Sequence, residues 1–267
     1  MARGWRLLLD GDAPGPWNMG VDEALLVSAA REATATLRFY TWRGAWLSVG
    51  YAQVVGASRR AACEAAGVGI VRRLTGGRAV LHGGDLTYAL AAPSELLPSG
   101  LRASYALVSN ALCEALRALG VPAERQPEER AGEASFDCFA RLAAEEVCAG
   151  GRKLVGSAQR RAGGAVLQHG SIRVEPDPAW ARRAAASARD GATSLRELGV
   201  EQSLDEVRQV CVEALRVALG GVLGAGRLTD RECRCALESA RHREKARGVE
   251  ARTPPWGSQG RLWATDR

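Results

Sequence analysis

Lysine is almost absent from this sequence, and its rarity makes Lys153 the first candidate for chemistry. The 267 residues include 36 lysines and arginines, of which only Lys153 and Lys245 are lysines. A lysine ammonium is compact and can lose its proton when buried, whereas an arginine guanidinium stays planar and charged. A chain that uses arginine for nearly every cation therefore suggests a chemical role for Lys153, although composition alone fits an ordinary surface cation equally well.

A hairpin pattern surrounds Lys153 and brings small residues close to it. The sequence alternates as a strand does over residues 153–159, is typical of a turn over 160–164, and alternates again over 165–174. Small residues inside a strand let a ligand or another backbone approach closely. The small residues of the first strand are Gly156, Ser157 and Ala158.

Two glycine pairs form a second candidate binding element, over residues 71–90. Glycine pairs let the backbone fold tightly and present N–H groups to a ligand, and the nearby arginines would suit a phosphate or a carbonyl group. Two ordinary hairpin turns would contain the same glycines, and a lone histidine is usually a structural hydrogen-bonding group. No GK[ST] sequence follows, so this is not a Walker loop. The element contains Arg72, Arg73, Gly76, Gly77, Arg78, His82, Gly83 and Gly84.

A cysteine could supply a nucleophile for such a site. A free thiol has a pKa of about 8.5, and a neighbouring cation favours the reactive thiolate by about 1.4 kcal/mol for each unit by which it lowers the pKa. Cys138 follows a polar loop and lies fifteen residues before Lys153. Cys148 is nearer in sequence but lies in a strand-like run, so it ranks second, and residue types alone leave the choice open. Three other cysteines lie on predicted helices, and we interpret them as small hydrophobic residues buried in the core. They are Cys63, Cys113 and Cys211.

Composition limits the class of partner. With 46% hydrophobic residues the chain can bury a full core, and its net charge of +6 suits an anionic partner. The arginines are scattered and aromatic residues make up only 5%, so no basic stripe with stacking aromatics indicates nucleic acid, and an acidic protein fits equally well. Seven cysteines without a CxxC pair, no signal peptide and no apolar run of about 18 residues predict a reduced, cytoplasmic protein with no metal site and no membrane span.

Strands and helices alternate over the first two thirds of the chain, and the last third is predicted to be helical. We expect an α+β fold, a mixed sheet flanked by helices, in a single domain over residues 1–250 that is helical from about residue 176 and is followed by a tail over 251–267. No GxGxxG joins a strand to a helix, which argues against a dinucleotide-binding unit. Strands are expected at 5–9, 36–42, 46–50, 69–73, 78–81, 86–91 and 121–125, and helices at 18–33, 58–66, 101–119, 179–189, 194–198, 203–219 and 229–247, with a loop over 10–16.

Three stretches together resemble the lipoate–protein ligase/octanoyltransferase superfamily, whose catalytic domain shares a fold with biotin protein ligases. They are RRLTGGRAVLHGGDLTYAL, SFDCF and GRKLVGSAQRRAGGAVLQHGSI, within a resemblance that covers roughly residues 5–240. Within the superfamily the sequence is most similar to LipM-type octanoyltransferases. The resemblance implies transfer of an octanoyl group, in lipoate biosynthesis, from octanoyl-acyl carrier protein to one lysine of a lipoyl domain such as the glycine cleavage H protein. It also implies a thioester intermediate on Cys138, activation by Lys153, and no cofactor.

Relatives with other reactions remain as alternatives. ATP-dependent lipoate–protein ligases typically carry a third glycine where this chain has Arg78, and they lack a cysteine at the position of Cys138. Octanoyl amidotransferases, which move octanoyl between lipoyl domains, also use a cysteine. This sequence departs from the expected pattern after His82, where an acidic residue is expected directly and Asp85 comes three residues later. A non-catalytic nucleic-acid-binding module is the least consistent alternative, because no helix-turn-helix precedes the domain.

The resemblance also implies a ligand site between two walls. The donor thioester would enter along glycine-rich backbone, its alkyl chain would occupy an apolar slot, and backbone N–H groups would hold the oxyanion. Carrier proteins and lipoyl domains are commonly acidic, so the positive net charge would speed encounter. The expected substrate-binding residues are Arg73, Gly76, Gly77, Arg78, His82, Gly156, Ser157, Ala158, Gln159, His169 and Gly170.

Overall fold

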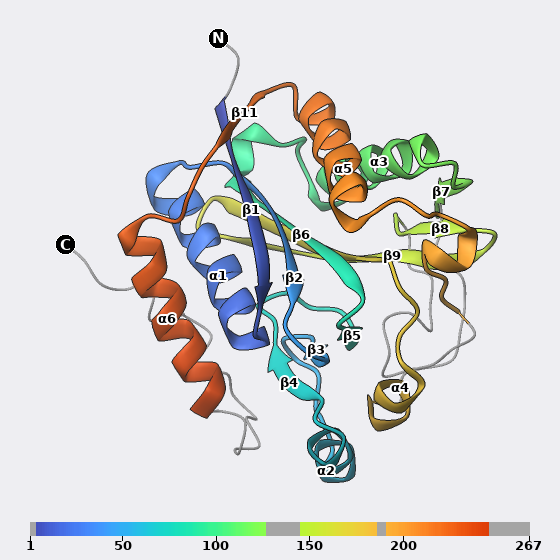
Figure 1. The fold of residues 1–267 in the computed structure, drawn as a ribbon. Helices are drawn as coiled ribbons and strands as arrows, with labels where there is room; N and C mark the ends of the chain where they lie inside the picture. Colours follow the sequence, from blue (N-terminus) through green and yellow to red (C-terminus); the bar gives the residue numbers. More distant parts are fainter. Residues whose placement is uncertain (1–3, 127–144, 186–190, 246–267) are drawn as a thin grey trace.

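Two β-sheets form the framework of the computed structural model, which describes residues 4–126, 145–185 and 191–245 (Figure 1). In this part of the chain the larger sheet has the strand order β11-β1-β2-β6-β10-β9-β8-β7, and the smaller has the order β4-β3-β5. β1 pairs in parallel with β11 and β2, whereas the other pairs of the larger sheet are antiparallel. The expected mixed sheet with flanking helices is therefore confirmed.

The elements have the following bounds. The strands are β1 Gly4–Ala13, β2 Thr36–Trp42, β3 Trp46–Val49, β4 Gly69–Arg72, β5 Val80–His82, β6 Asp85–Pro93, β7 Ala123–Arg125, β8 Val147–Ala149, β9 Arg152–Ala162, β10 Ala165–Arg173 and β11 Val222–Ala225. The helices are α1 Gly15–Glu32, α2 Ala57–Ala65, α3 Leu101–Ala118, α4 Ala179–Ala185, α5 Leu204–Leu219 and α6 Asp230–Lys245, with short 3₁₀ turns η1 Ser94–Leu96 and η3 Arg196–Leu198. The predicted tail over 251–267 lies outside the described residues.

Helices cover both faces of the large sheet. α3 and α5 pack on one face and bury one hydrophobic cluster, while α1 and α6 pack on the other and bury a second (Figure 1). α2 and α4 lie beside the small sheet, over a third cluster. As a result, every residue of β6 and β10 is buried. Both strands nevertheless carry polar side chains, and buried polar groups need hydrogen-bond partners.

The last third of the chain was expected to be helical, but it also contains a strand. β11 lies where a glycine-rich turn was predicted after α5, and it pairs in parallel with β1 at the edge of the large sheet. Its four residues are mostly exposed. The strand forms because a distant partner is available, which no local alternation in the sequence reports.

Two predicted loops are also shorter than expected. β1 continues to Ala13, with a register shift against β2 between Leu9 and Asp12, so the predicted 10–16 loop is mostly strand. In the β9–β10 hairpin the turn is confined to Gly163 and Gly164, whose φ angles are 58° and 76°. Positive φ at both central residues is the geometry that two-residue hairpins favour, so residues 160–162 belong to the strand.

Helix boundaries follow local capping chemistry. At the start of α5 the Ser203 hydroxyl accepts a hydrogen bond from the Glu206 N–H at 3.3 Å, and the Glu206 carboxylate accepts one from the Ser203 N–H at 2.7 Å. This reciprocal capping box satisfies N–H groups that a helix start leaves unpaired. Gly220 ends the helix with a φ of 59°. α2 differs from expectation, since its N-cap is Gly56 rather than Ser58.

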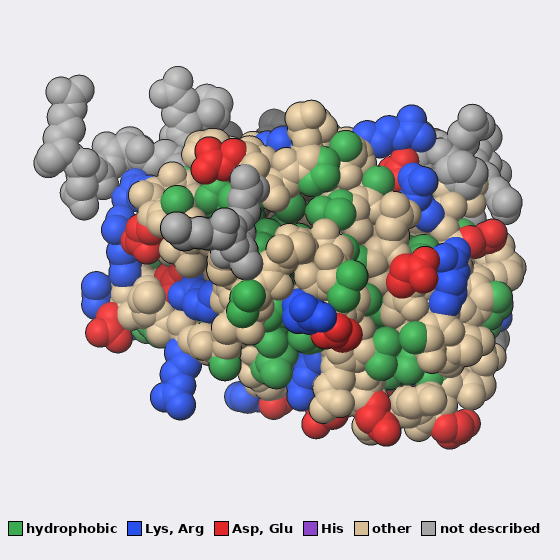
Figure 2. Space-filling view, turned by 90° about the horizontal axis from the view of Figure 1, so that it is seen from above, with side chains coloured by type: hydrophobic (Ala, Val, Ile, Leu, Met, Phe, Trp, Pro, Cys, Tyr) green, Lys and Arg blue, Asp and Glu red, His purple; other side chains and the backbone are tan. Residues whose placement is uncertain are grey.

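Surface properties agree with a chain whose positive charge is spread out. On the face seen in Figure 2, lysine and arginine side chains lie among acidic and apolar ones rather than in a stripe. Within the described ranges, no helix combines the length and the apolar character that crossing a membrane requires.

α6 is fastened to α1 and to the backbone beside β4 by one buried cluster. Arg243 donates to the Glu23 carboxylate at 2.9 Å and to the Arg72 carbonyl at 3.1 Å. The Ser239 hydroxyl donates to the same Glu23 carboxylate. α6 therefore connects the C-terminal part of the chain to the start of the glycine-rich element.

The close approach of α1 and α6 yields a stability prediction. A Cβ added at Gly20 would lie 2.4 Å from the backbone oxygen of Ala236, so the two helices would have to move apart. Alanine gains about 1 kcal/mol of helix propensity over glycine, but overpacking typically costs about 1–3 kcal/mol. We expect Gly20→Ala to lower the melting temperature, as measured by circular dichroism. Gly11→Ala, where the added atom meets nothing within 4 Å, should leave it unchanged, and an equal or higher value for Gly20→Ala would contradict this packing argument.

Candidate active site

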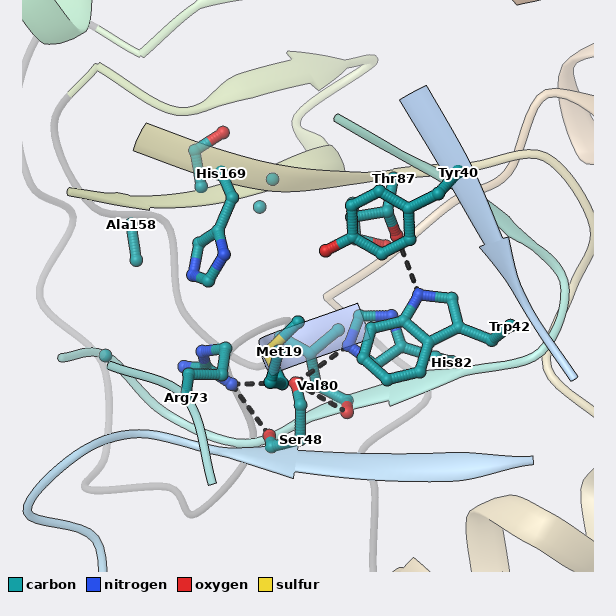
Figure 3. A pocket seen from close by; sticks show the side chains of 15 residues that line it. Met19, Tyr40, Trp42, Ser48, Arg73, Val80, His82, Thr87, Ala158 and His169 are labelled. Carbon is teal, nitrogen blue, oxygen red and sulfur yellow. Dashed lines mark hydrogen bonds between the residues drawn. The ribbon is translucent and has the colours of Figure 1, made fainter. Parts of the chain in front are cut away.

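An open cavity lies where the β9–β10 hairpin faces the small sheet and α1 (Figure 3). Its empty space is about 390 Å³ including the solvent at its mouth. Its accessible lining is almost entirely apolar, which suits an alkyl chain. The lining residues are Met19, Tyr40, Trp42, Ser48, Arg73, Gly77, Val80, His82, Thr87, Gly156, Ser157, Ala158, His169, Gly170 and Ser171.

Most residues expected to bind substrate gather around this cavity. Arg73, Gly77 and His82 come from the glycine-rich element, and Gly156, Ser157, Ala158, His169 and Gly170 come from the hairpin. In Figure 3, His169 and Ala158 lie across the cavity from Arg73 and Ser48. Three other expected residues are not in the lining, namely Gly76, Arg78 and Gln159.

Gln159 is engaged within the protein instead. Its side-chain amide donates to Gln168 Oε1 at 2.9 Å and to the Ser104 hydroxyl at 3.1 Å. These contacts link β9 to β10 and to α3. A role for the Gln159 backbone N–H toward an oxyanion stays a prediction.

Arg73 holds the glycine-rich loop in place. Its guanidinium donates to the carbonyl and hydroxyl oxygens of Ser48, at 2.7 and 2.9 Å, and to the carbonyls of Gly76 and Arg78, at 3.0 and 2.9 Å. Arg72 similarly donates to three carbonyls of the segment that follows β3. Two of the three arginines that the sequence suggested for a phosphate or carbonyl ligand, Arg72 and Arg73, thus bind backbone carbonyls of the protein itself.

His169 belongs to a buried chain of hydrogen bonds behind the cavity wall. Its Nδ1 donates to Asp22 at 2.8 Å, and its Nε2 lies 2.7 Å from the Thr75 hydroxyl. Burial would raise the pKa of Asp22, but the His169 hydrogen bond and the Arg38 charge hold it below its usual value. Burial lowers the pKa of His169 despite Asp22. His169 is therefore a neutral ring whose Nε2 accepts the Thr75 proton.

His82 is part of a matching chain on the other wall. Its Nδ1 donates to Asp85 at 2.7 Å and its Nε2 lies 2.7 Å from the Ser48 hydroxyl, while Trp42 stacks on its ring with a centroid distance of 3.9 Å. Burial would raise the pKa of Asp85, but interaction with His82 and further hydrogen bonds hold it below its usual value. The acidic residue expected directly after His82 is thus supplied by Asp85, three positions later.

Gly170 is required by close packing in the cavity wall. An added Cβ would lie 2.4 Å from the Ser157 hydroxyl and 2.6 Å from the Tyr88 ring. Tyr88 and Ser157 share a hydrogen bond of 2.8 Å, and burial raises the pKa of Tyr88 to about 12. The Gln-His-Gly sequence therefore places a neutral histidine next to a residue that must lack a side chain.

Lys153 is buried, so the interpretation of an ordinary surface cation is wrong. It lies on β9, as the hairpin pattern predicted, and its side chain is 0% exposed and forms an ion pair with Glu146. It is not among the residues that line the cavity, although Gly156 follows it by only three positions on the same strand. The catalytic role of Lys153 stays a prediction, because no ligand is present.

The cysteines divide into those the structure describes and Cys138, which lies outside the described residues. Cys148 is buried on β8, where its thiol lies 3.6 Å from the Glu124 carbonyl. The predicted burial of the three helix cysteines is confirmed. Burial raises the pKa of Cys113 to about 11 and that of Cys211 to about 12, so these thiols are poor nucleophiles.

Sequence reasoning missed the residues that support the site from other elements. Asp22, Trp42 and Ser48 act through partners that are far away in the sequence, whereas Glu146 pairs with Lys153 on the neighbouring strand. One signal was present: Asn18 and Asp22 lie four residues apart in an apolar helix, and this spacing puts both on one face. Both are buried, and both contact Arg38.

Comparison with known sequences gives consistent matches. The model of the lipoyl protein ligase A/B catalytic domain matches residues 14–216. Octanoyltransferase LipM of Symbiobacterium thermophilum is 40% identical over 254 residues, which covers 87% of this chain and 92% of the relative. Octanoyltransferase LipM of Bacillus subtilis is 37% identical over 186 residues, which covers 65% of this chain and 66% of the relative.

Solved structures share the architecture. Lipoate-protein ligase A bound with ATP superposes with a TM-score of 0.75 at 25% identity, covering 93% of this chain and 98% of the other. A bipartite lipoate protein ligase from Thermoplasma acidophilum, described with its E2 lipoyl domain, gives a TM-score of 0.70 at 24% identity, covering 94% and 96%. At this lower identity, the second match supports a shared fold and nothing more.

The buried neutral state of His169 predicts acid sensitivity. Its pKa is lowered from 6.5 in the folded protein, so below about pH 6.5 the unfolded chain binds a proton that the folded protein does not. The free energy of unfolding should therefore fall as the pH decreases from 7 to 5. We expect His169→Gln to make this fall shallower, by up to about 1.4 kcal/mol per pH unit, in urea titrations at several pH values. Exposed His242 is the control. Equal slopes of the unfolding free energy against pH for wild type, His169→Gln and His242→Gln would refute the assignment of His169 as a buried neutral ring.

Proposed function

Because the chain belongs to the lipoyl protein ligase A/B catalytic domain family and is an octanoyltransferase of lipoate biosynthesis, we propose the following route for the octanoyl group. Octanoyl-acyl carrier protein donates the octanoyl group to Cys138, which forms a thioester. A lysine of a lipoyl domain, such as that of the glycine cleavage H protein, then accepts it as an amide. The single observation that carries this proposal is the buried Lys153, on the same strand as Gly156, which lines the glycine-rich apolar cavity.

The cavity supports the proposal as the site of the octanoyl chain. An eight-carbon chain has no polar group along its length, and the accessible lining is apolar. Gly77 at one wall, with a φ of 86°, lets backbone approach the ligand closely, and Gly170 at the other lets Ser157 and Tyr88 pack tightly in that wall. The thioester carbonyl at the end of the chain then lies toward the mouth, within reach of backbone N–H donors such as that of Gly77.

The segment that contains Cys138 starts and ends beside Lys153. The chain leaves the described part at Gln126 and re-enters it at Glu145, and the two are joined by a backbone hydrogen bond of 2.8 Å. The next residue, Glu146, forms the ion pair with Lys153. A neighbouring cation favours a thiolate, which supports Lys153 as the group that activates Cys138.

The reaction consists of two balanced transfers. In the first, the Cys138 thiolate attacks the octanoyl carbonyl carbon, the bond to the carrier sulfur breaks, and the carrier leaves as a thiol with a proton from the Lys153 ammonium group. In the second, the neutral amine of the acceptor lysine attacks the acyl-enzyme, the bond to the Cys138 sulfur breaks, and the amine proton passes to the now neutral Lys153. The Cys138 thiolate is regenerated beside the ammonium group.

The partners and location follow from the same chemistry. Both protein substrates are commonly acidic, so the net charge of +6 speeds their encounter with the enzyme. The substrates are cytoplasmic proteins, and the enzyme works in the same compartment. The thioester donor is already activated, so ATP is not needed.

A first test asks where the acyl group is held. We expect intact-protein mass spectrometry to detect an octanoyl adduct after mixing with octanoyl-acyl carrier protein in the absence of ATP. Cys138→Ala should abolish the adduct, and Cys148→Ala should keep it, because the Cys148 thiol is buried away from substrate. An adduct that persists in Cys138→Ala would overturn the site, and a strict ATP requirement would indicate a ligase.

A second test asks whether Lys153 contributes more than charge. Arginine keeps a positive charge that stabilises the thiolate, but it cannot exchange a proton with the incoming amine. We expect Lys153→Arg to be alkylated by iodoacetamide at Cys138 and yet to transfer octanoyl about 10²–10⁴-fold more slowly. Both rates should be measured on one preparation, and transfer near the wild-type rate would mean that Lys153 acts only as a charge.

A further inference from the structure

Lys153 and Glu146 form an ion pair that is almost completely removed from solvent. Their side chains are 0% and 5% exposed, respectively. Surface ion pairs contribute little because water screens them. A buried pair is different, since removing one partner leaves a charge in a medium that stabilises it poorly. The state of Lys153 therefore depends strongly on Glu146.

The backbone around Lys153 is shaped to direct its side chain. Val147 of β8 pairs with Val155 of β9, but the next residue, Cys148, pairs with Lys153, so Leu154 is an extra residue in β9. Such a β-bulge bends the strand and re-aims the side chains beside it, and bulges are frequent next to active sites. The strand is therefore distorted at the one position where the lysine lies.

A separate segment fixes the backbone of Lys153 from its other side. The Lys153 N–H donates to the Gly191 carbonyl at 2.8 Å, and its carbonyl accepts from the Thr193 N–H at 2.9 Å. With both backbone groups held, the freedom that remains lies in the long side chain. The ion pair with Glu146 restricts that freedom at the ammonium end.

We propose that Glu146 is a positioning residue that holds the Lys153 ammonium group of the resting enzyme in place for octanoyl transfer. The inference rests on the proposed function, in which the ammonium group stabilises the Cys138 thiolate. A nearby carboxylate favours the charged form of a lysine, whereas burial without one favours the neutral form. Loss of the carboxylate would thus remove the cation that the thiolate needs, without touching the substrate.

The neighbouring Glu145 provides a matched control. It is also buried, but it points to different cations: it accepts from Arg102 Nε at 2.8 Å and forms an ion pair with Arg125. Its φ of 70° turns the chain between the two carboxylates. Glu145→Gln removes the same charge one residue away and leaves the Lys153 pair intact.

The experiment compares Glu146→Gln, Glu146→Asp and Glu145→Gln by steady-state kinetics and by the pH dependence of Cys138 alkylation. We expect Glu146→Gln to lower kcat about 10²-fold, the usual effect of a misplaced catalytic group, while KM for octanoyl-acyl carrier protein stays nearly constant. The midpoint of alkylation should move to higher pH. Glu146→Asp should restore part of both properties, and Glu145→Gln should behave as wild type.

A cycle with Lys153→Met separates failure of this inference from failure of the proposed function. Glu146→Gln should cause no further loss in the Lys153→Met background, because the two residues act as a unit. This double variant also removes both charges of the pair, so it tests the pair even if Glu146→Gln folds poorly. If Lys153→Met transfers octanoyl normally, the catalytic role of Lys153 is wrong. If Lys153→Met is inactive while Glu146→Gln keeps the wild-type kcat and alkylation profile, only the role of Glu146 is overturned.

Discussion

A buried charge needs compensation, and the site is arranged around this constraint at Lys153. Taking an ammonium group out of water costs several kcal/mol unless an opposite charge and hydrogen bonds offset the loss. Here the opposite charge comes from Glu146, the direction of the side chain from the bulge in β9, and the backbone contacts from residues 191–193. Glu146 and the bulge are close to Lys153 in the sequence, but residues 191–193 are distant, so the lysine acquires all these contacts only in the folded chain.

The cavity beside Lys153 meets a related requirement with hydrogen bonds. An alkyl chain needs an apolar wall, yet α1, β5, β6 and β10 bring two histidines and two aspartates to or behind it. Both ring nitrogens of His82 and of His169 are bonded to protein groups, so their polar atoms are satisfied along the wall and not by the ligand. Such closed networks also make the wall rigid. The surface that a ligand would contact can therefore be apolar, although several of the residues that form the wall are polar.

How much of the structure could be predicted from the sequence depends on how far apart in the chain the interacting residues lie. Leu101–Ala118 has a strong helical pattern of its own and was predicted to within one residue, whereas Val222–Ala225 is a strand only because it finds β1. In the site, Lys153 could be found because its residue type is rare. Asp22 could not be assigned, because its partner His169 is 147 residues away and approaches only through folding. Glu146 is near Lys153 in the sequence, but the bulge that brings the two side chains together is not visible there. The assignment of Cys138 came from resemblance to a family and not from spacing.

The pairing of β1 with β11 sets a time order on folding during synthesis. Gly4 lies opposite Val222, so one side of the first strand has no neighbour until more than about 200 further residues have been made. At translation rates of about 5–20 residues per second, this delay is roughly 10–45 seconds. During that interval the growing chain exposes a row of unpaired N–H and C=O groups, which other chains could extend. The edge strand β11 is therefore added late, and the nascent enzyme is most vulnerable to aggregation before its C-terminal segment emerges from the ribosome.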